Sequence, residues 1–222
     1  MQPMTAEETR SWILDGLRSG HRRIFVKFGD GEYLAMHGAN KGWKSINGDH
    51  YTDEVQSALH NALVKLAQHP DAIIGKWPDH APWANLRQMH ADHLQPRWAD
   101  YTSLLLQRGN ERHMFKFWDA VRNLCDIDYV APACMAPMAR WLNARHIVIP
   151  DDNAHPIDTT PGEYTAKLVI VGAGFAAKPL IAALSDGDQH LLDVGSGFDI
   201  LCRGTTRQDQ PDEQHIRNIF GL

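Results

Sequence analysis

The chain has 222 residues, of which 43% are hydrophobic and 22% are charged, and its formal net charge is −5. This length and composition suit one large globular domain, and the acidic balance argues against a strongly basic nucleic-acid binder. No uninterrupted apolar run of about 18 residues is present, so we expect no membrane span. The three cysteines form no metal-type pattern and the N-terminal residues do not resemble a secretion signal. We therefore expect reduced thiols and a cytoplasmic protein, in the host cell cytoplasm if the chain is viral.

Short apolar runs and helical patterns alternate along the chain. The first helix opens at Thr5, whose hydroxyl and the carboxylate of Glu8 match a capping box. Further helical patterns cover 52–68, 82–106, 111–124, 136–144 and 176–184. Six apolar runs predict strands, at 24–28, 72–77, 129–133, 146–150, 167–174 and 190–195.

Most of these runs are continuously apolar, which favours a sheet buried on both faces. Strands that alternate with helices predict an α/β fold, Rossmann-like, with a mostly parallel sheet of about six strands and flanking helices. We expect 1–222 to form a single domain, with a helical Trp/Arg-rich insert over about 80–125 and a polar C-terminal arm over about 205–222. Such folds bind ligands beyond the carboxyl ends of their strands, so the turns there are candidate sites.

The turn after the first predicted strand reads Phe28-Gly29-Asp30-Gly31-Glu32. Two carboxylates together with substrate phosphates are the usual ligands of Mg²⁺ or Mn²⁺, and the glycines let the backbone approach a bulky anion. Alternatively, Asp30 is the N-cap of a helix over 31–39 and Glu32 favours its positive end. The residues alone do not favour the metal-site interpretation over the helix-cap interpretation. We expect loss of Glu32 to affect catalysis more than stability.

The turn after 146–150 contains Asp152 and Asn153. Their side chains could hydrogen-bond a base, a ribose or a sugar, or they could belong to a solvated loop with Asx turns.

The turn after the fifth predicted strand fits the dinucleotide-binding pattern G-x-G-x-x-A at Gly172, Gly174 and Ala177, with Asp193 about 20 residues further on. Only about 50 residues follow this motif, too few for a dinucleotide domain built forward from it. A tight strand-to-helix turn is the alternative, and a phosphate at the helix N-terminus is compatible with both.

The last turn, after 190–195, is similar to the first motif of S-adenosylmethionine methyltransferases. Only 27 residues follow Gly195, which is too few for the remaining strands of that fold. Asp193, Ser196 and Asp199 nevertheless lie where ligands of an α/β sheet bind. A pair of histidines, His90 and His93, lacks a third ligand for a metal site.

Together, an early strand ending in F-G-D-G-E, a later loop with Pro150 and Asn153, a G-x-G turn and a closing D-V-G turn resemble the GT-D class of glycosyltransferases. This family was first known as a domain of unknown function. The resemblance implies a Rossmann-like domain that uses a nucleotide sugar, with Asp30 and Glu32 holding a divalent metal at the diphosphate. Lys27 replaces an arginine that is common in the family, and Ser196 replaces a histidine.

The sequence therefore predicts a glycosyltransferase that uses a nucleoside-diphosphate sugar and Mn²⁺ or Mg²⁺. Candidates for the catalytic base are Asp193, Asp199 and Asp152. The acceptor could be a glycan, a protein or a hydroxymethylated base in viral DNA. The sequence is also compatible with a homo-oligomeric protein. The alternatives are an NAD(P)-dependent oxidoreductase and a non-catalytic nucleotide-binding module. The predicted donor-binding residues are Lys27, Phe28, Gly29, Gly31, Asn153, Gly172, Gly174, Gly195 and Ser196.

Overall fold

The protein forms a seven-stranded sheet in which every strand pair is parallel, in the order β3-β2-β1-β7-β6-β4-β5. The computed structural model describes residues 2–38, 52–77, 84–150, 164–195, 197–202 and 211–222. The strands are β1 (Ile24–Lys27), β2 (Ala72–Lys76), β3 (Trp98–Asp100), β4 (Ile127–Pro132), β5 (Arg145–Ile149), β6 (Leu168–Val171) and β7 (His190–Asp193). The predicted parallel α/β fold is confirmed.

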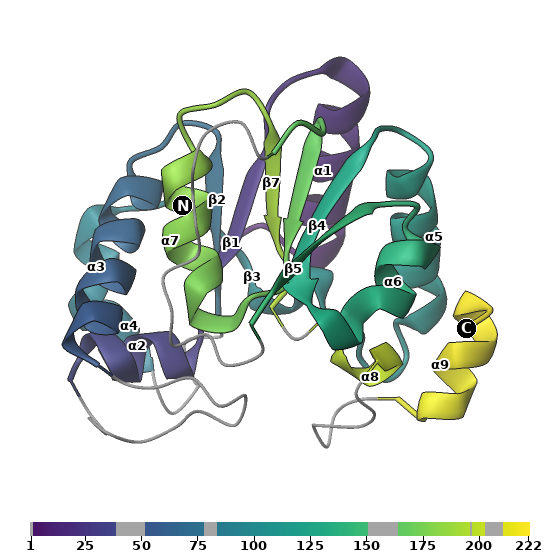
Figure 1. The fold of residues 1–222 in the computed structure, drawn as a ribbon. Coiled ribbons are helices and arrows are strands. Elements are labelled where there is room, and N and C mark those ends of the chain that lie inside the picture. Colours follow the sequence, from purple (N-terminus) through teal and green to yellow (C-terminus); the bar gives the residue numbers. More distant parts are fainter. Residues whose placement is uncertain (1, 39–51, 78–83, 151–163, 196, 203–210) are drawn as a thin grey trace.

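Helices cover both faces of the sheet (Figure 1). The α-helices are α1 (Ala6–Ser19), α2 (Asp30–Met36), α3 (Asp53–Ala67), α4 (Ala84–His90), α5 (Glu111–Arg122), α6 (Ala136–Trp141), α7 (Ala177–Leu184), α8 (Asp199–Cys202) and α9 (Glu213–Phe220). Successive residues of β1 point to opposite faces, as the pleat requires. Phe25 packs into the core on the side of α1 and α5, whereas Ile24 and Val26 pack with α3 and α7. This three-layer arrangement explains why the strands are continuously apolar.

The section expected as one helix over 82–106 contains a strand, and that expectation was wrong. Here α4 is followed by short 3-10 turns and by β3, whose Ala99 pairs with Gly75 of β2. The stretch from about 80 to 125 therefore contributes an edge strand to the sheet. A three-residue edge strand is too short to show a hydrophobic period, so its pattern could not reveal it.

The polar C-terminal arm expected over 205–222 also needs correction. Residues 211–222 include α9, which buries Ile216 and Phe220. The Phe220 ring lies 5.4 Å from that of Phe115 and 4.8 Å from that of Trp141. Only two strongly buried apolar side chains anchor this helix. Because the segment is polar on average, its packing against the core could not be predicted.

None of the helices in the described ranges is long and apolar enough to span a lipid bilayer.

Replacing Phe220 by alanine tests the packing of α9. The Phe220→Ala change should lower the free energy of unfolding by about 3 kcal/mol or more, because it leaves a cavity between Phe115 and Trp141. The control is His215→Ala on the exposed face of the same helix, with an expected change within about 0.5 kcal/mol. Urea denaturation measures both, and equal small effects would contradict the packing described.

Candidate functional site

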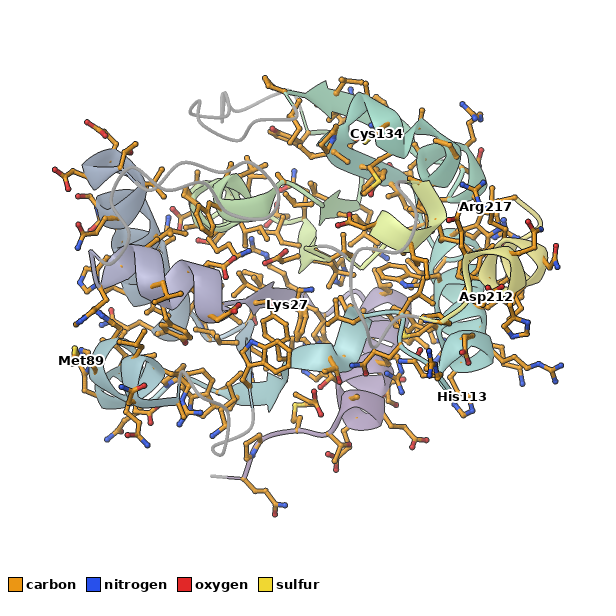
Figure 2. All side chains as sticks on the ribbon, turned by 90° about the horizontal axis from the view of Figure 1, so that it is seen from below. Lys27, Met89, His113, Cys134, Asp212 and Arg217 are labelled. Carbon is orange, nitrogen blue, oxygen red and sulfur yellow. The ribbon has the colours of Figure 1, made fainter. Side chains whose placement is uncertain are left out.

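The central strands β1 and β7 bring two glycine turns together at their carboxyl ends. They are neighbours in the sheet although they lie more than 160 residues apart in the chain, and Phe25 is in register with Leu192. The helices that follow these strands, α2 and α8, both lie along the lower edge of the molecule in Figure 1. Figure 2 looks onto this edge and shows Lys27, the last residue of β1, near its middle.

The turn after β1 is closed by Glu32. Gly29 is the N-cap of α2, and the Glu32 carboxylate accepts a 2.8 Å hydrogen bond from its backbone N–H. Asp30 is the first helical residue and is exposed, so the alternative that made Asp30 the N-cap is not correct. A Cβ atom at Gly29 would lie 2.7 Å from the Tyr101 hydroxyl, which explains the glycine at this position.

The turn after β7 is closed in a similar way by Asp193, which is fully buried. Its carboxylate accepts hydrogen bonds from the backbone N–H groups of Gly195, at 2.8 Å, and of Lys27, at 3.1 Å. The Lys27 ammonium in turn donates to the carbonyl of Val194 at 2.8 Å. Gly195 has a φ of +48°, and a Cβ atom there would lie 2.9 Å from the Lys27 Nζ atom. Glycine is therefore required by both conformation and space.

Lys178, on α7, connects the two turns. Its Nζ atom lies 2.6 Å from Glu32 Oε1 and 3.1 Å from Asp193 Oδ2, and it donates a 3.1 Å hydrogen bond to the Gly174 carbonyl. Burial alone would lower the pKa of Lys178, but the carboxylates of Asp193 and Glu32 outweigh this effect and raise it above its ordinary value. The ammonium therefore stays charged inside the protein.

One aromatic ring borders the Lys27 side chain, and a second ring stacks on the first. Tyr101 follows β3 directly, and its ring centre lies 5.2 Å from the Lys27 Nζ atom, within the range of a cation–π contact. Trp77, which follows β2, stacks on Tyr101 with ring centres 4.3 Å apart. Tyr101 could not be predicted as a neighbour of this site, because the pattern of 98–100 does not reveal a strand.

The remaining predicted residues differ in their surroundings, and three of them lie outside the described residues. The Phe28 side chain is buried in the core with Tyr33, so only its backbone can face a ligand. Gly172 follows β6 and Gly174 has a φ of +52° in the next turn. Asp199 is buried at the start of α8. Gly31 is half-buried in α2, and Asp152, Asn153 and Ser196 lie outside the described residues.

A metal site made from both Asp30 and Glu32 does not fit this arrangement. Residues two positions apart on a helix point in different directions, and here Asp30 is exposed whereas Glu32 is buried. One Glu32 oxygen contacts Lys178 and the other accepts from Gly29. Across the described part of the chain, no three His, Cys, Asp or Glu side chains are grouped so as to hold a metal ion. Glu32 therefore has a structural role at the start of α2, in addition to any role in catalysis.

Lys178 is the residue that sequence reasoning missed. Its signal was present, because it is the one charged residue in the otherwise apolar helix AKPLIAAL. It also follows Gly174 by four positions, one helical turn, which brings it back to the carboxyl ends of the strands. A lone lysine in a buried helix requires a partner, and the candidates at that edge were the acids already singled out.

Comparison with known proteins identifies the fold. No family model and no curated protein matches the chain. Among solved structures, it is similar to one described as the highly conserved domain of unknown function 1792 with a distinct glycosyltransferase fold, at a TM-score of 0.65 and 15% identity. That match covers 95% of this chain and 85% of the other.

A second structure, described as a new glycosyltransferase (DUF1792) from Streptococcus sanguinis, matches at a TM-score of 0.56 and 15% identity, over 97% of this chain and 92% of that one. A selenomethionine form of domain 1792 matches at 0.63 and 14%, over 95% and 85%. The chain therefore has this glycosyltransferase fold, and the resemblance to the GT-D class is confirmed at the level of the fold.

The two carboxylates of the first turn should differ in their effect on stability. Glu32→Ala leaves the Lys178 ammonium with one buried carboxylate fewer and should cost about 3–5 kcal/mol of unfolding free energy. Asp30→Ala removes an exposed charge from the first turn of α2 and should cost under about 1 kcal/mol. Urea unfolding of both variants tests this difference, and a larger loss for Asp30→Ala would contradict the assigned geometry.

Proposed function

We propose that the protein is a glycosyltransferase that transfers a sugar from a nucleoside-diphosphate sugar to a hydroxyl acceptor. The observation that carries this proposal is the group of buried charges at the carboxyl ends of β1 and β7, in a fold shared with glycosyltransferase structures. Lys27 and Lys178 are each 2% exposed, and the carboxylates beside them are also buried. Buried ion pairs contribute little net stability and gather at functional sites.

Each element of the group has a role in this proposal. The glycine turns at Gly29 and Gly195 bring backbone close to the donor diphosphate without side chains in the way. The Lys27 ammonium supplies positive charge at the Gly195 turn, where the leaving diphosphate gains negative charge. Trp77, which is half-buried and stacks on the buried Tyr101 ring, offers aromatic surface for a base or a sugar ring.

Asp193 has a different role from the one that the sequence suggested. Because it is fully buried and both of its oxygens contact protein groups, we assign it to positioning the Gly195 turn. Asp199 and Asp152 remain the candidates for the base that accepts the acceptor proton.

The same observation weakens the dinucleotide alternative. An NAD(P)-binding turn at Gly172 and Gly174 would use Asp193 to bind the ribose hydroxyls. Asp193 is the last residue of the adjacent strand β7, but its oxygens are taken by Lys27, Lys178 and Gly195. A ribose would have to displace these contacts from a side chain that solvent does not reach.

The dependence on Mn²⁺ or Mg²⁺ stays a prediction of the resemblance. A divalent cation would neutralise the leaving diphosphate as a Lewis acid. Of the two carboxylates in the first turn, Asp30 is the exposed one, so we assign the metal-binding role to Asp30.

A donor screen tests the proposed activity. We expect at least one UDP-, GDP- or CDP-sugar with Mn²⁺ to raise the melting temperature by about 5 °C or more at saturation, because a ligand that binds only the folded state stabilises it. Slow release of free sugar from the same donor should follow. NAD(H) should give no shift. Stabilisation by NAD(H) alone would contradict the proposal, and binding without any sugar release or transfer would favour a nucleotide-binding module.

The Asp30→Asn variant tests the metal assignment. It should remove the part of the donor-induced thermal shift that depends on Mn²⁺, because an amide binds a hard cation more weakly than a carboxylate does. The fold should be unaffected, since Asp30 is exposed. If the Mn²⁺-dependent shift is unchanged, Asp30 is not a ligand. Mass analysis of glycan, protein and hydroxymethylated DNA after incubation with the active donor identifies the acceptor.

A further inference from the structure

The Lys178 ammonium uses its full hydrogen-bonding capacity on the protein. An ammonium has three N–H donors, and three acceptors surround this one: Glu32 Oε1 at 2.6 Å, Asp193 Oδ2 at 3.1 Å and the Gly174 carbonyl at 3.1 Å. The side chain is 3% exposed. With these partners in place it has no proton left for a phosphate of the substrate.

The two carboxylates around Lys178 are committed to the turns. The second oxygen of Glu32 accepts from Gly29, the N-cap of α2 in the turn after β1. The second oxygen of Asp193 accepts from Gly195 in the turn after β7, and its first oxygen also accepts from the Lys27 backbone. A single buried nitrogen atom thus joins the two turns that the proposed function assigns to the donor.

We infer that Lys178 is a built-in cation that takes the place of a divalent metal ion at Glu32 and Asp193. It acts as a positioning residue: it holds the Gly29 and Gly195 turns at a fixed separation, and it prevents a metal ion from using Glu32. This inference deepens the proposed function and rests on it for the nature of the ligand. The D-x-E motif implies a metal ion held by both Asp30 and Glu32, whereas this inference places the Lys178 ammonium at Glu32.

Two physical arguments support the presence of the Lys178 ammonium in place of a divalent metal ion. A divalent ion at Glu32 would lie next to a buried ammonium, and two cations at that distance in a poorly solvated site repel each other strongly. Displacing Lys178 instead would leave its nitrogen without three hydrogen bonds inside the protein. Conversely, removing the ammonium would leave two buried carboxylates facing one position, which is the oxygen ligand set that a divalent cation favours.

Mn²⁺ titration of the full chain without any donor tests the inference, by calorimetry and by the electron paramagnetic resonance signal of free Mn²⁺. Glu32→Gln should bind Mn²⁺ as the wild type does, within about twofold, because Glu32 is not a ligand. Lys178→Met should bind Mn²⁺ about tenfold or more tightly than the wild type, because it frees both carboxylates. A merely structural lysine would not produce this gain. Since no donor is present, the outcome is independent of whether the proposed transferase activity is found.

The Lys178→Met variant should also melt about 10 °C lower than the wild type, with recovery on addition of Mn²⁺. Should it not fold, the double variant Lys178→Met/Glu32→Gln keeps the test available, because it removes one charge of each sign and should recover a cooperative melting transition. The matched control is Lys65→Met, which breaks an exposed pair with Asp186 and should alter neither property. Tenfold weaker Mn²⁺ binding by Glu32→Gln would overturn the inference. So would unchanged Mn²⁺ affinity in Lys178→Met or, where that variant does not fold, a double variant without a cooperative melting transition.

Discussion

The ammonium of Lys178 lies between the carboxylates of Glu32 and Asp193, and the turns after β1 and β7 are positioned through these contacts. None of the three charges is stable inside the protein alone, because burying an unpaired ion costs several kcal/mol. Each is therefore tied to the others, and the backbone bonds that the carboxylates make pass this constraint to Gly29 and Gly195. The sheet brings β1 and β7 together, but the charge group determines how their turns face solvent.

This constraint explains why the site combines rigid and open parts. Behind the turns, Lys178, Glu32 and Asp193 are buried and paired, so they fix the geometry of the turns away from solvent. On the solvent side, Asp30 is exposed. Catalysis of group transfer depends on charges that are held in place before the reaction starts, and a buried network that supports an accessible turn provides this. The two acids of the first turn thus differ in their surroundings, because Glu32 is buried and paired whereas Asp30 is exposed.

The sequence was sufficient to predict the fold, and insufficient to predict the contacts between the residues of the candidate site. Continuous apolar runs between helices predicted the parallel sheet, and the turns after β1 and β7 do meet. The three-residue strand β3 was not predicted, because it is defined by its pairing with β2 and not by its own sequence pattern. The ion pair of Glu32 was missed for a similar reason: its partner Lys178 lies 146 positions away, and no local pattern records such a pairing.

The assignment of Lys178 as the cation at Glu32 depends most directly on what surrounds Glu32 when a ligand is bound. The decisive measurement is a crystal structure with Mn²⁺ and the nucleoside diphosphate that stabilises the protein most. We predict the diphosphate against the Gly29 and Gly195 turns, with the Lys178 nitrogen still within hydrogen-bonding distance of Glu32 and Asp193. A manganese ion bound directly to Glu32, with Lys178 displaced, would contradict the account, as would a diphosphate bound away from these turns.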